Sequence, residues 1–261
     1  MINWQLGTMG FGFQDWEGPF YPQGYNSRNY LRYYSRYFTA VELDTTFYGP
    51  PRISQVKRWL QSTPAEFIFC AKVPRQITHK HRLIHAQAEL DIFLERMAIF
   101  GNRLGAILIQ LPPDFSIAEV DALRLFLETL PREFRYAVEF RHLSWYVPET
   151  LNWFADPHIC WAATEYLDLP AQFKLTANFG YVRWIGEHGR YDRKDHERVN
   201  LTSRLVKWAD NIIQYNNQLE SVYGFFNNDY AGFSPATCNR FKQIVGETVL
   251  DFRPPQQGLL F

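Results

Sequence analysis

Charged side chains recur at the ends of short apolar segments, and these are the residues that could perform chemistry. Glu139 and Arg141 follow Tyr136-Ala137-Val138, while Glu42 and Lys72 end two similar segments earlier in the chain. Side chains two apart on a strand share a face, so Glu139 and Arg141 are predicted to point the same way. Partial burial can raise a carboxyl pKa to a value useful for proton transfer. The pattern therefore predicts acid–base chemistry, with these four residues as the catalytic candidates.

A second group of residues follows predicted strands and offers hydrogen-bond donors or aromatic faces. Such groups bind anions, or stack on a sugar ring or a base. Around Arg183, Gly186 and Gly189 allow the backbone to come close to a ligand, and Arg190 adds a second charge. We therefore expect an anion, namely a phosphate group, between this loop and the last predicted helix. The predicted substrate- or anion-binding residues are Tyr48, His79, Gln110, Trp145, Arg183, Gly186, Asn227 and Asn228.

Each of these assignments has a structural alternative. The Glu139 carboxylate would also suit an ion network with Arg141 or Lys72, and Lys72 would serve as a charge partner, an anion contact or a Schiff-base amine. As an alternative to binding an anion, Arg183 would pair with Glu165, and most of the aromatic residues would pack against loops.

Metal and cofactor signals are weak. His79 and His142 are the histidines that fall just after predicted strand ends, and neither belongs to an HExxH pairing. The chain has no Gly-x-Ser-x-Gly elbow. We predict no metal ligands and no cofactor.

The elements that must position these residues are repeated strand-then-helix units. Eight such units in a chain of 261 residues indicate an α/β fold, a single (β/α)8 TIM barrel over residues 1–261, whose site lies at the carboxyl ends of the strands. An open doubly wound sheet is the alternative. The predicted strands are Trp4 to Phe13, Ala40 to Asp44, Phe67 to Lys72, Ala106 to Leu111, residues 136–141, Ile159 to Ala163, Tyr181 to Ile185 and Val222 to Asn227.

Local signals set several helix boundaries. Ser116 and Glu119 form a capping box, Ser144 is predicted as the N-cap of a helix after the fifth strand, and Ser234 with Pro235 begins the last helix. Residues 166–180 lack a clear period.

Composition excludes several classes of protein. Basic and acidic residues number 27 each, so a non-specific nucleic-acid binder is not favoured, although nucleic acid stays possible as a partner. The three cysteines indicate free thiols in a reducing compartment. No run approaches the roughly 18 apolar residues of a membrane helix. We expect a cytoplasmic protein with a small, anionic substrate.

The motifs also resemble those of a family, the YecE-like (DUF72) family of uncharacterised conserved proteins, over nearly the whole chain. The resemblance implies a TIM barrel and no established activity. It rests on Gly7-Thr8-Met9-Gly10, Asp15-Trp16, Phe20-Tyr21-Pro22, Val41-Glu42, Thr46-Phe47-Tyr48, Lys72-Val73-Pro74, Ile77-Thr78-His79, Gln110-Leu111-Pro112-Pro113, Glu139-Phe140-Arg141-His142, Ser144-Trp145, Tyr181-Val182-Arg183 and Phe226-Asn227-Asn228.

Three functions fit these observations. The first is an enzyme that uses the carboxylates and Lys72 on a small phosphorylated or sugar-like substrate. The second is a metal-assisted phosphoesterase or isomerase. The third is a nucleotide- or nucleic-acid-binding protein without catalysis.

Overall fold

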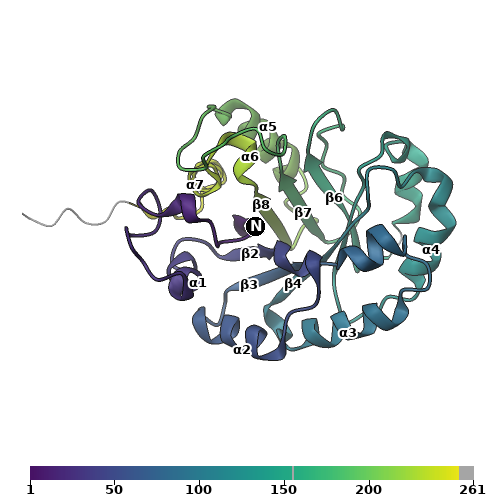
Figure 1. The fold of residues 1–261 in the computed structure, drawn as a ribbon. Coiled ribbons are helices and arrows are strands. Elements are labelled where there is room, and N and C mark those ends of the chain that lie inside the picture. Colours follow the sequence, from purple (N-terminus) through teal and green to yellow (C-terminus); the bar gives the residue numbers. More distant parts are fainter. Residues whose placement is uncertain (155, 253–261) are drawn as a thin grey trace, which may run out of the picture.

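Eight parallel strands form one sheet that curves into a nearly closed barrel, with helices around its outside (Figure 1). The computed structural model describes residues 1–154 and 156–252. The order of the strands is β1-β8-β7-β6-β5-β4-β3-β2, which confirms the predicted TIM-barrel architecture and excludes the doubly wound sheet. The strands are β1 (Asn3–Thr8), β2 (Ala40–Leu43), β3 (Ile68–Lys72), β4 (Leu104–Gln110), β5 (Tyr136–Glu139), β6 (Ile159–Glu165), β7 (Phe179–Trp184) and β8 (Ser221–Phe226).

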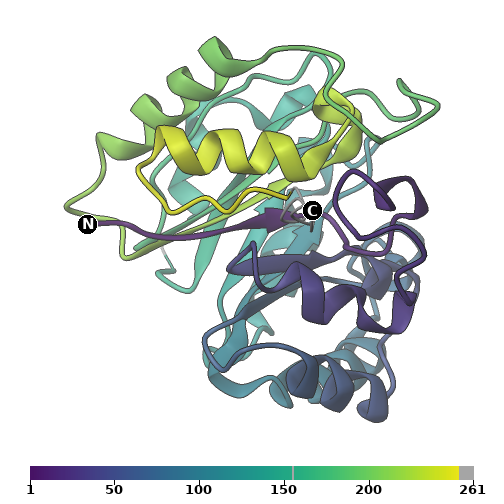
Figure 2. The same ribbon diagram turned by 90° about the vertical axis from the view of Figure 1, so that its left-hand side faces the viewer.

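The helices cover the outer face of the barrel. Figure 2 shows α7 beside β1, and the ring of Trp4 on β1 meets that of Phe241 on α7 edge to face at 5.6 Å. The helices are α1 (Tyr30–Tyr34), α2 (Ile53–Ser62), α3 (Gln87–Ala98), α4 (Val120–Glu128), α5 (Thr202–Ile213), α6 (Asn228–Ala231) and α7 (Ser234–Ile244). The capping box of Ser116 and Glu119 is confirmed, just ahead of α4.

Two of the predicted strand-then-helix units are incomplete. The helix predicted after β5 is wrong, because two 3-10 helices, Leu143–Trp145 and Pro148–Trp153, take its place. The N-cap of the first is His142 rather than Ser144. Burial of the Trp145 ring against Phe140, with centroids 4.5 Å apart, fixes this turn in a way that no local signal reveals. After β6, the described residues up to Phe179 form no helix.

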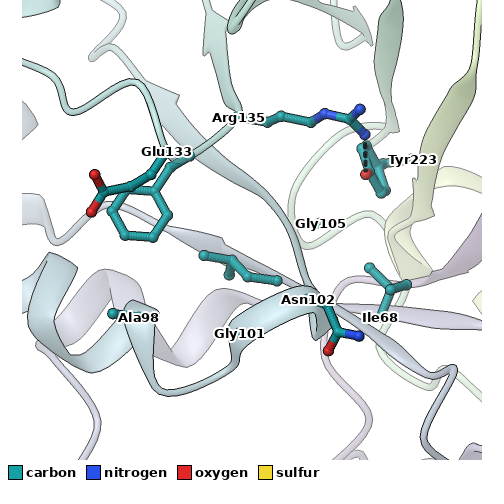
Figure 3. Close-up of a pocket in the computed structure, with 10 residues that line it drawn as sticks. Ile68, Ala98, Gly101, Asn102, Gly105, Glu133, Arg135 and Tyr223 are labelled. Carbon is teal, nitrogen blue, oxygen red and sulfur yellow. Dashed lines mark hydrogen bonds between the residues drawn. The ribbon is translucent and has the colours of Figure 1, made fainter.

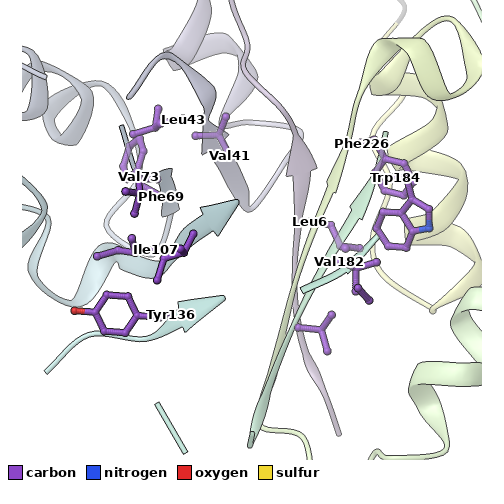
Figure 4. Close-up of a cluster of buried hydrophobic side chains, with 14 of the residues drawn as sticks. Leu6, Val41, Leu43, Phe69, Val73, Ile107, Tyr136, Val182, Trp184 and Phe226 are labelled. Carbon is purple, nitrogen blue, oxygen red and sulfur yellow. The ribbon is translucent and has the colours of Figure 1, made fainter. Parts of the chain in front are cut away.

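Strand alternation divides the buried residues between the outer face and the interior of the barrel. The outward side chains pack against the helices, as Figure 4 shows for residues that include Leu6, Phe69 and Trp184. Full burial of each such side chain contributes about 1.5–3 kcal/mol. Below the carboxyl end, most inward side chains on β2 to β6 are small, among them Ala40, Cys70 and Ala137, while those on β7 and β8 are large. This asymmetry lets the aromatic rings of β7 and β8 fill the interior.

The barrel closes at a seam between β1 and β2 that carries little backbone pairing. A single isolated bridge joins Met9 to Glu42 among the described residues. A Cβ atom on Gly7 would lie 1.9 Å from the Ala40 carbonyl oxygen, so only glycine allows the two strands to come this close. The Tyr34 hydroxyl bridges the gap, because it accepts from the Thr8 N–H at 2.8 Å and donates to the Ala40 carbonyl oxygen at 3.1 Å.

Candidate active site

A layer of polar side chains fills the carboxyl end of the barrel interior. The alternation that places Ala40, Cys70 and Ala137 inside the barrel also turns the residue two positions later inward. We call this set the polar layer; it consists of Glu42, Lys72, Gln110, Glu139 and Arg183, and all five are buried.

Arg183 joins two carboxylates across the polar layer. Its Nε and Nη2 atoms donate to the two oxygens of Glu42 at 2.9 and 2.8 Å, and its Nη1 atom donates to Glu139 at 2.6 Å. Both carboxylates are fully buried, at 0% exposure. Removing one partner from such a cluster would leave a buried charge unpaired, so the arrangement holds β2, β5 and β7 in register at this end.

Arg141 completes the cluster by pairing with the other oxygen of Glu139 through its Nε atom. Burial alone would raise the pKa of Glu139, but the charges of Arg141 and Arg183 overcome this effect and lower the pKa to about 2. The Glu139 carboxyl is therefore ionised at neutral pH. The guanidinium group of Arg141 also lies over the ring of Tyr166, 3.9 Å from its centroid.

Glu42 has a further partner that the predicted site residues did not include. The Tyr181 hydroxyl donates to it at 2.7 Å from within the barrel, and burial followed by the charge of Glu42 raises the pKa of Tyr181. Tyr181 lies two residues before Arg183 and shares its inward face, so the same alternation could have identified it.

Lys72 lies beside this cluster in different surroundings. Its Nζ atom donates to the Gln110 side-chain oxygen at 2.6 Å and lies 3.9 Å from the centroid of the Phe47 ring. Among the described residues, no carboxylate forms an ion pair with it. Burial, followed by the charge of Arg183, lowers the pKa of Lys72 to about 7. Its amine is therefore partly neutral near physiological pH.

Asp44 is a second titratable group that the candidate residues did not include. It begins the 3-10 helix Asp44–Tyr48, and burial, followed by the negative charge of Glu42, raises its pKa. The charges of Arg183 and Lys72 act on it in the opposite direction. The available signal was its position two residues after Glu42, the spacing that relates Arg141 to Glu139.

His79 and Tyr48 border Lys72 on the side of the β2 and β3 loops. The His79 ring packs edge to face against Phe47, with centroids 5.0 Å apart, and burial followed by the charge of Lys72 lowers its pKa to about 4. The imidazole is therefore neutral at physiological pH. Tyr48 is 79% exposed and packs edge to face against the same Phe47 ring.

The predicted binding residues Trp145 and Asn228 form structural hydrogen bonds instead. The indole of Trp145 is fully buried and donates to the Phe115 carbonyl oxygen at 2.7 Å. The side-chain oxygen of Asn228 accepts from the Trp16 indole and from Ser234, so it ties a loop to the start of α7.

The partners of Arg183 in the structure differ from those that the sequence predicted. The Arg183 side chain points into the barrel toward its two carboxylates, and its predicted pairing with Glu165 is wrong, because Glu165 instead accepts from Arg204, Trp208 and Tyr230.

Gly186 and Asn227 lie in this region with structural partners. Gly186 has a φ of +73°, and a Cβ atom there would lie 2.4 Å from the Asp229 carbonyl oxygen. Asn227 caps α6 by accepting from the Asp229 N–H at 2.9 Å. Both residues therefore shape the loop after β8 against the loop after β7.

No helix in residues 1–154 or 156–252 is long and apolar enough to cross a membrane. In the same residues, no group of three or more His, Cys, Asp or Glu side chains is arranged to hold a metal ion. All three cysteines are buried free thiols.

Comparison with known proteins gives a consistent result. The chain is 38% identical over 210 residues to the UPF0759 protein YecE of Escherichia coli (strain K12), which covers 71% of this chain and 77% of that one. It is 28% identical over 284 residues to the UPF0759 protein YunF of Bacillus subtilis (strain 168), covering 97% and 99% of the two chains.

Solved structures of similar proteins share the fold. A DUF72 family protein from Thermotoga maritima MSB8 superposes with a TM-score of 0.77 at 27% identity, covering 94% of this chain and all of the other. A DUF72 family protein from Enterococcus faecalis V583 gives a TM-score of 0.74 at 21% identity, which shows the fold alone. The family model described as "Protein of unknown function DUF72" matches residues 5–258, and the chain therefore belongs to the DUF72 family.

Proposed function

We propose that this protein is an enzyme that transfers protons on a small anionic substrate, phosphorylated or sugar-like, with Lys72 as the acid–base group. The observation that carries this proposal is the buried Lys72 amine, which is held by Gln110 and forms no ion pair with a carboxylate of the described residues, at the end of the barrel where enzymes of this fold bind substrates. Burial lowers the pKa of this amine to about 7. A general acid–base group works best when its pKa is close to the operating pH.

Asp44 supplies the second titrating group. Burial raises the pKa of the Asp44 carboxyl and lowers the pKa of the Lys72 amine. Both pKa values therefore shift toward neutral pH, that of Asp44 from below and that of Lys72 from above. Pairs of groups whose surroundings shift their pKa values in this way commonly divide the acid and base roles. In this proposal the acid–base role expected for Glu42 and Glu139 passes to Lys72 and Asp44.

Glu42, Glu139 and Arg183 then act as a rigid frame. Their mutual hydrogen bonds satisfy both carboxylates, and the same guanidinium charge disfavours protonated Lys72. Loss of Arg183 would therefore raise the pKa of Lys72 and shift the pH dependence of the reaction.

Arg141 is our candidate for the anion contact, with Tyr48 and neutral His79 at the rim. Its guanidinium group lies on the Tyr166 ring and is anchored by Glu139, which fixes its plane. A planar, fixed guanidinium group binds carboxylate or phosphate through two parallel hydrogen bonds. Gln110 fixes the lysine amine at 2.6 Å, so proton donor and anion contact are both pre-positioned.

The experiment that tests this function is solvent exchange. The protein is incubated in D₂O with a panel of phosphorylated aldoses and ketoses and their unphosphorylated analogues, and deuterium incorporation next to the carbonyl is followed by mass spectrometry. We expect exchange with a phosphorylated member, a loss of about 10²-fold or more in Lys72→Met, and a rate that changes around pH 7.

A matched control is Lys80→Met, since Lys80 is an exposed lysine at the end of the helical turn Gln76–Lys80 that follows β3. This variant should retain the wild-type exchange rate. Equal rates in Lys72→Met and wild type, or no exchange with any member of the panel, would count against the proposal.

The same lowered pKa also favours a second mechanism, in which the neutral amine of Lys72 attacks a substrate carbonyl carbon. Loss of water would then give a Schiff base. Borohydride added during turnover reduces such an adduct to a stable secondary amine, so a mass increase on Lys72 identifies this mechanism and an unmodified Lys72 identifies simple proton transfer.

A further inference from the structure

A cavity lies at the opposite end of the barrel from Lys72. Ile68 and Leu104 are the first residues of β3 and β4, whereas Lys72 is the last residue of β3. The cavity has a volume of about 480 Å³, which falls within the range of roughly 300–1,000 Å³ typical of small-molecule sites. Its lining consists of Ile68, Ala98, Gly101, Asn102, Leu104, Gly105, Glu133, Phe134, Arg135 and Tyr223 (Figure 3).

The guanidinium group of Arg135 lines this cavity and is held firmly in place. Arg135 donates from Nη1 to the Tyr223 hydroxyl at 3.1 Å and to the Ser221 hydroxyl at 3.3 Å, and its guanidinium group lies 5.2 Å from the centroid of the Phe179 ring. Figure 3 shows the Arg135 side chain extending toward Tyr223. These contacts fix the plane of the guanidinium group before any ligand arrives.

The Nη2 atom of Arg135 is held only loosely. It donates to Glu220 at 3.1 Å, but the Glu220 side chain is 63% exposed and that of Arg135 is 34% exposed. An ion pair this exposed contributes little to stability, so the carboxylate of a ligand can replace that of Glu220.

The other walls define the rest of the ligand. Ile68, Leu104 and Phe134 present apolar surface, and Gly105 leaves room for the Tyr223 ring, because a Cβ atom there would lie 2.6 Å from Tyr223 Cε1. Glu133 adds a negative charge at the exposed rim, which disfavours phosphates and other multiply charged anions.

We propose that this cavity binds a small monocarboxylate with an apolar or aromatic body, whose carboxylate replaces Glu220 on Arg135. This site is separate from the proposed acid–base site and does not depend on it. Benzoate is a suitable probe, with benzyl alcohol as its neutral analogue and inorganic phosphate as a compact anion.

Two-dimensional ¹H–¹⁵N NMR of the full chain tests the proposal. Benzoate is expected to shift the amide signals of Gly101, Asn102 and Gly105 saturably, while benzyl alcohol and phosphate bind at least about tenfold more weakly. Arg135→Met should weaken benzoate binding by about tenfold or more, because a charge-assisted contact is lost. Arg124→Met, which changes an exposed arginine on α4 outside both proposed sites, should leave benzoate binding unchanged.

Glu220→Gln provides an independent test on an exposed side chain. It removes the competing carboxylate, so benzoate should bind roughly two- to fivefold more tightly. Unchanged or weaker binding in Glu220→Gln, shifts confined to the Lys72 end, or equal binding of phosphate would each overturn the proposal. Wild-type affinity in Arg135→Met would show that Arg135 serves only to close this end of the barrel.

Discussion

Arg183 is the residue on which the polar layer depends, because one guanidinium group serves two fully buried carboxylates. Among the residues that the structure describes, Arg183→Met leaves Glu42 hydrogen-bonded only to Tyr181 and Glu139 paired only with Arg141. We expect this variant to lose about 3–5 kcal/mol of unfolding free energy in urea titrations. As a control, Arg124→Met removes a pair whose side chains are 66% and 78% exposed and should change stability by less than about 1 kcal/mol. Equal effects of the two changes would contradict the buried network.

Substitution of Lys72 is expected to raise the free energy of unfolding, whereas substitution of Arg183 is expected to lower it. Its pKa is lowered from 10.5 to about 7 in the folded chain, so between these values the unfolded chain binds more protons than the folded one. Stability therefore rises with pH across this window, and the penalty of burying the ammonium group is largest below pH 7. Lys72→Met should be more stable than wild type at pH 6, by of the order of a few kcal/mol, with the difference shrinking toward pH 10.

Urea unfolding of both proteins at pH 6, 8 and 9.5 measures this difference. A constant difference across the three pH values would show that Lys72 keeps an ordinary pKa, and the proposed acid–base role would lose its basis.

At the scale of single elements, Gly7 decides how closely β1 approaches β2. In Gly7→Ala the new methyl group would meet the Ala40 carbonyl oxygen, a backbone atom that cannot move aside without shifting β2. We expect a loss of about 3 kcal/mol or more in unfolding free energy. Gly12→Ala is the control, because a Cβ atom at Gly12 would meet no atom within 4 Å, and its cost should stay within about 0.5 kcal/mol.

The strands and the polar layer could be predicted from the sequence because both depend on a local property, the alternation of side chains. This alternation turns Glu42 and Arg183 toward the barrel interior, where the two side chains meet although their strands are far apart in the chain. The partners of Glu165 and the burial of Trp145 could not be predicted, since they depend on which distant side chains reach the same place. The two 3-10 helices after β5 could not be predicted either. The packing of Trp145 against Phe140 overrides the capping signal of Ser144 there.

At the scale of the whole molecule, the Tyr34 hydroxyl links the first two strands of the barrel. Tyr34→Phe removes the acceptor of the Thr8 N–H within a fully buried site. We expect a loss of about 1–3 kcal/mol in unfolding free energy and faster hydrogen exchange at the Thr8 amide. Tyr37→Phe, whose hydroxyl bonds to the Tyr33 hydroxyl near the surface, should leave that amide unchanged.

The weak seam between β1 and β2 also has a consequence for protein synthesis. The main ladder of β1 is with β8, and Asn3 pairs with Ser221, which is 221 − 3 = 218 residues later. At roughly 5–20 residues per second, β1 waits about 10–45 seconds on the ribosome for its partner. During this time an apolar strand end, including Trp4 and Leu6, is exposed as an unpaired edge. Nascent chains stalled before Ser221 should therefore engage holding chaperones and aggregate on release, whereas chains released from the ribosome after α7 has been made should be protected from protease at β1.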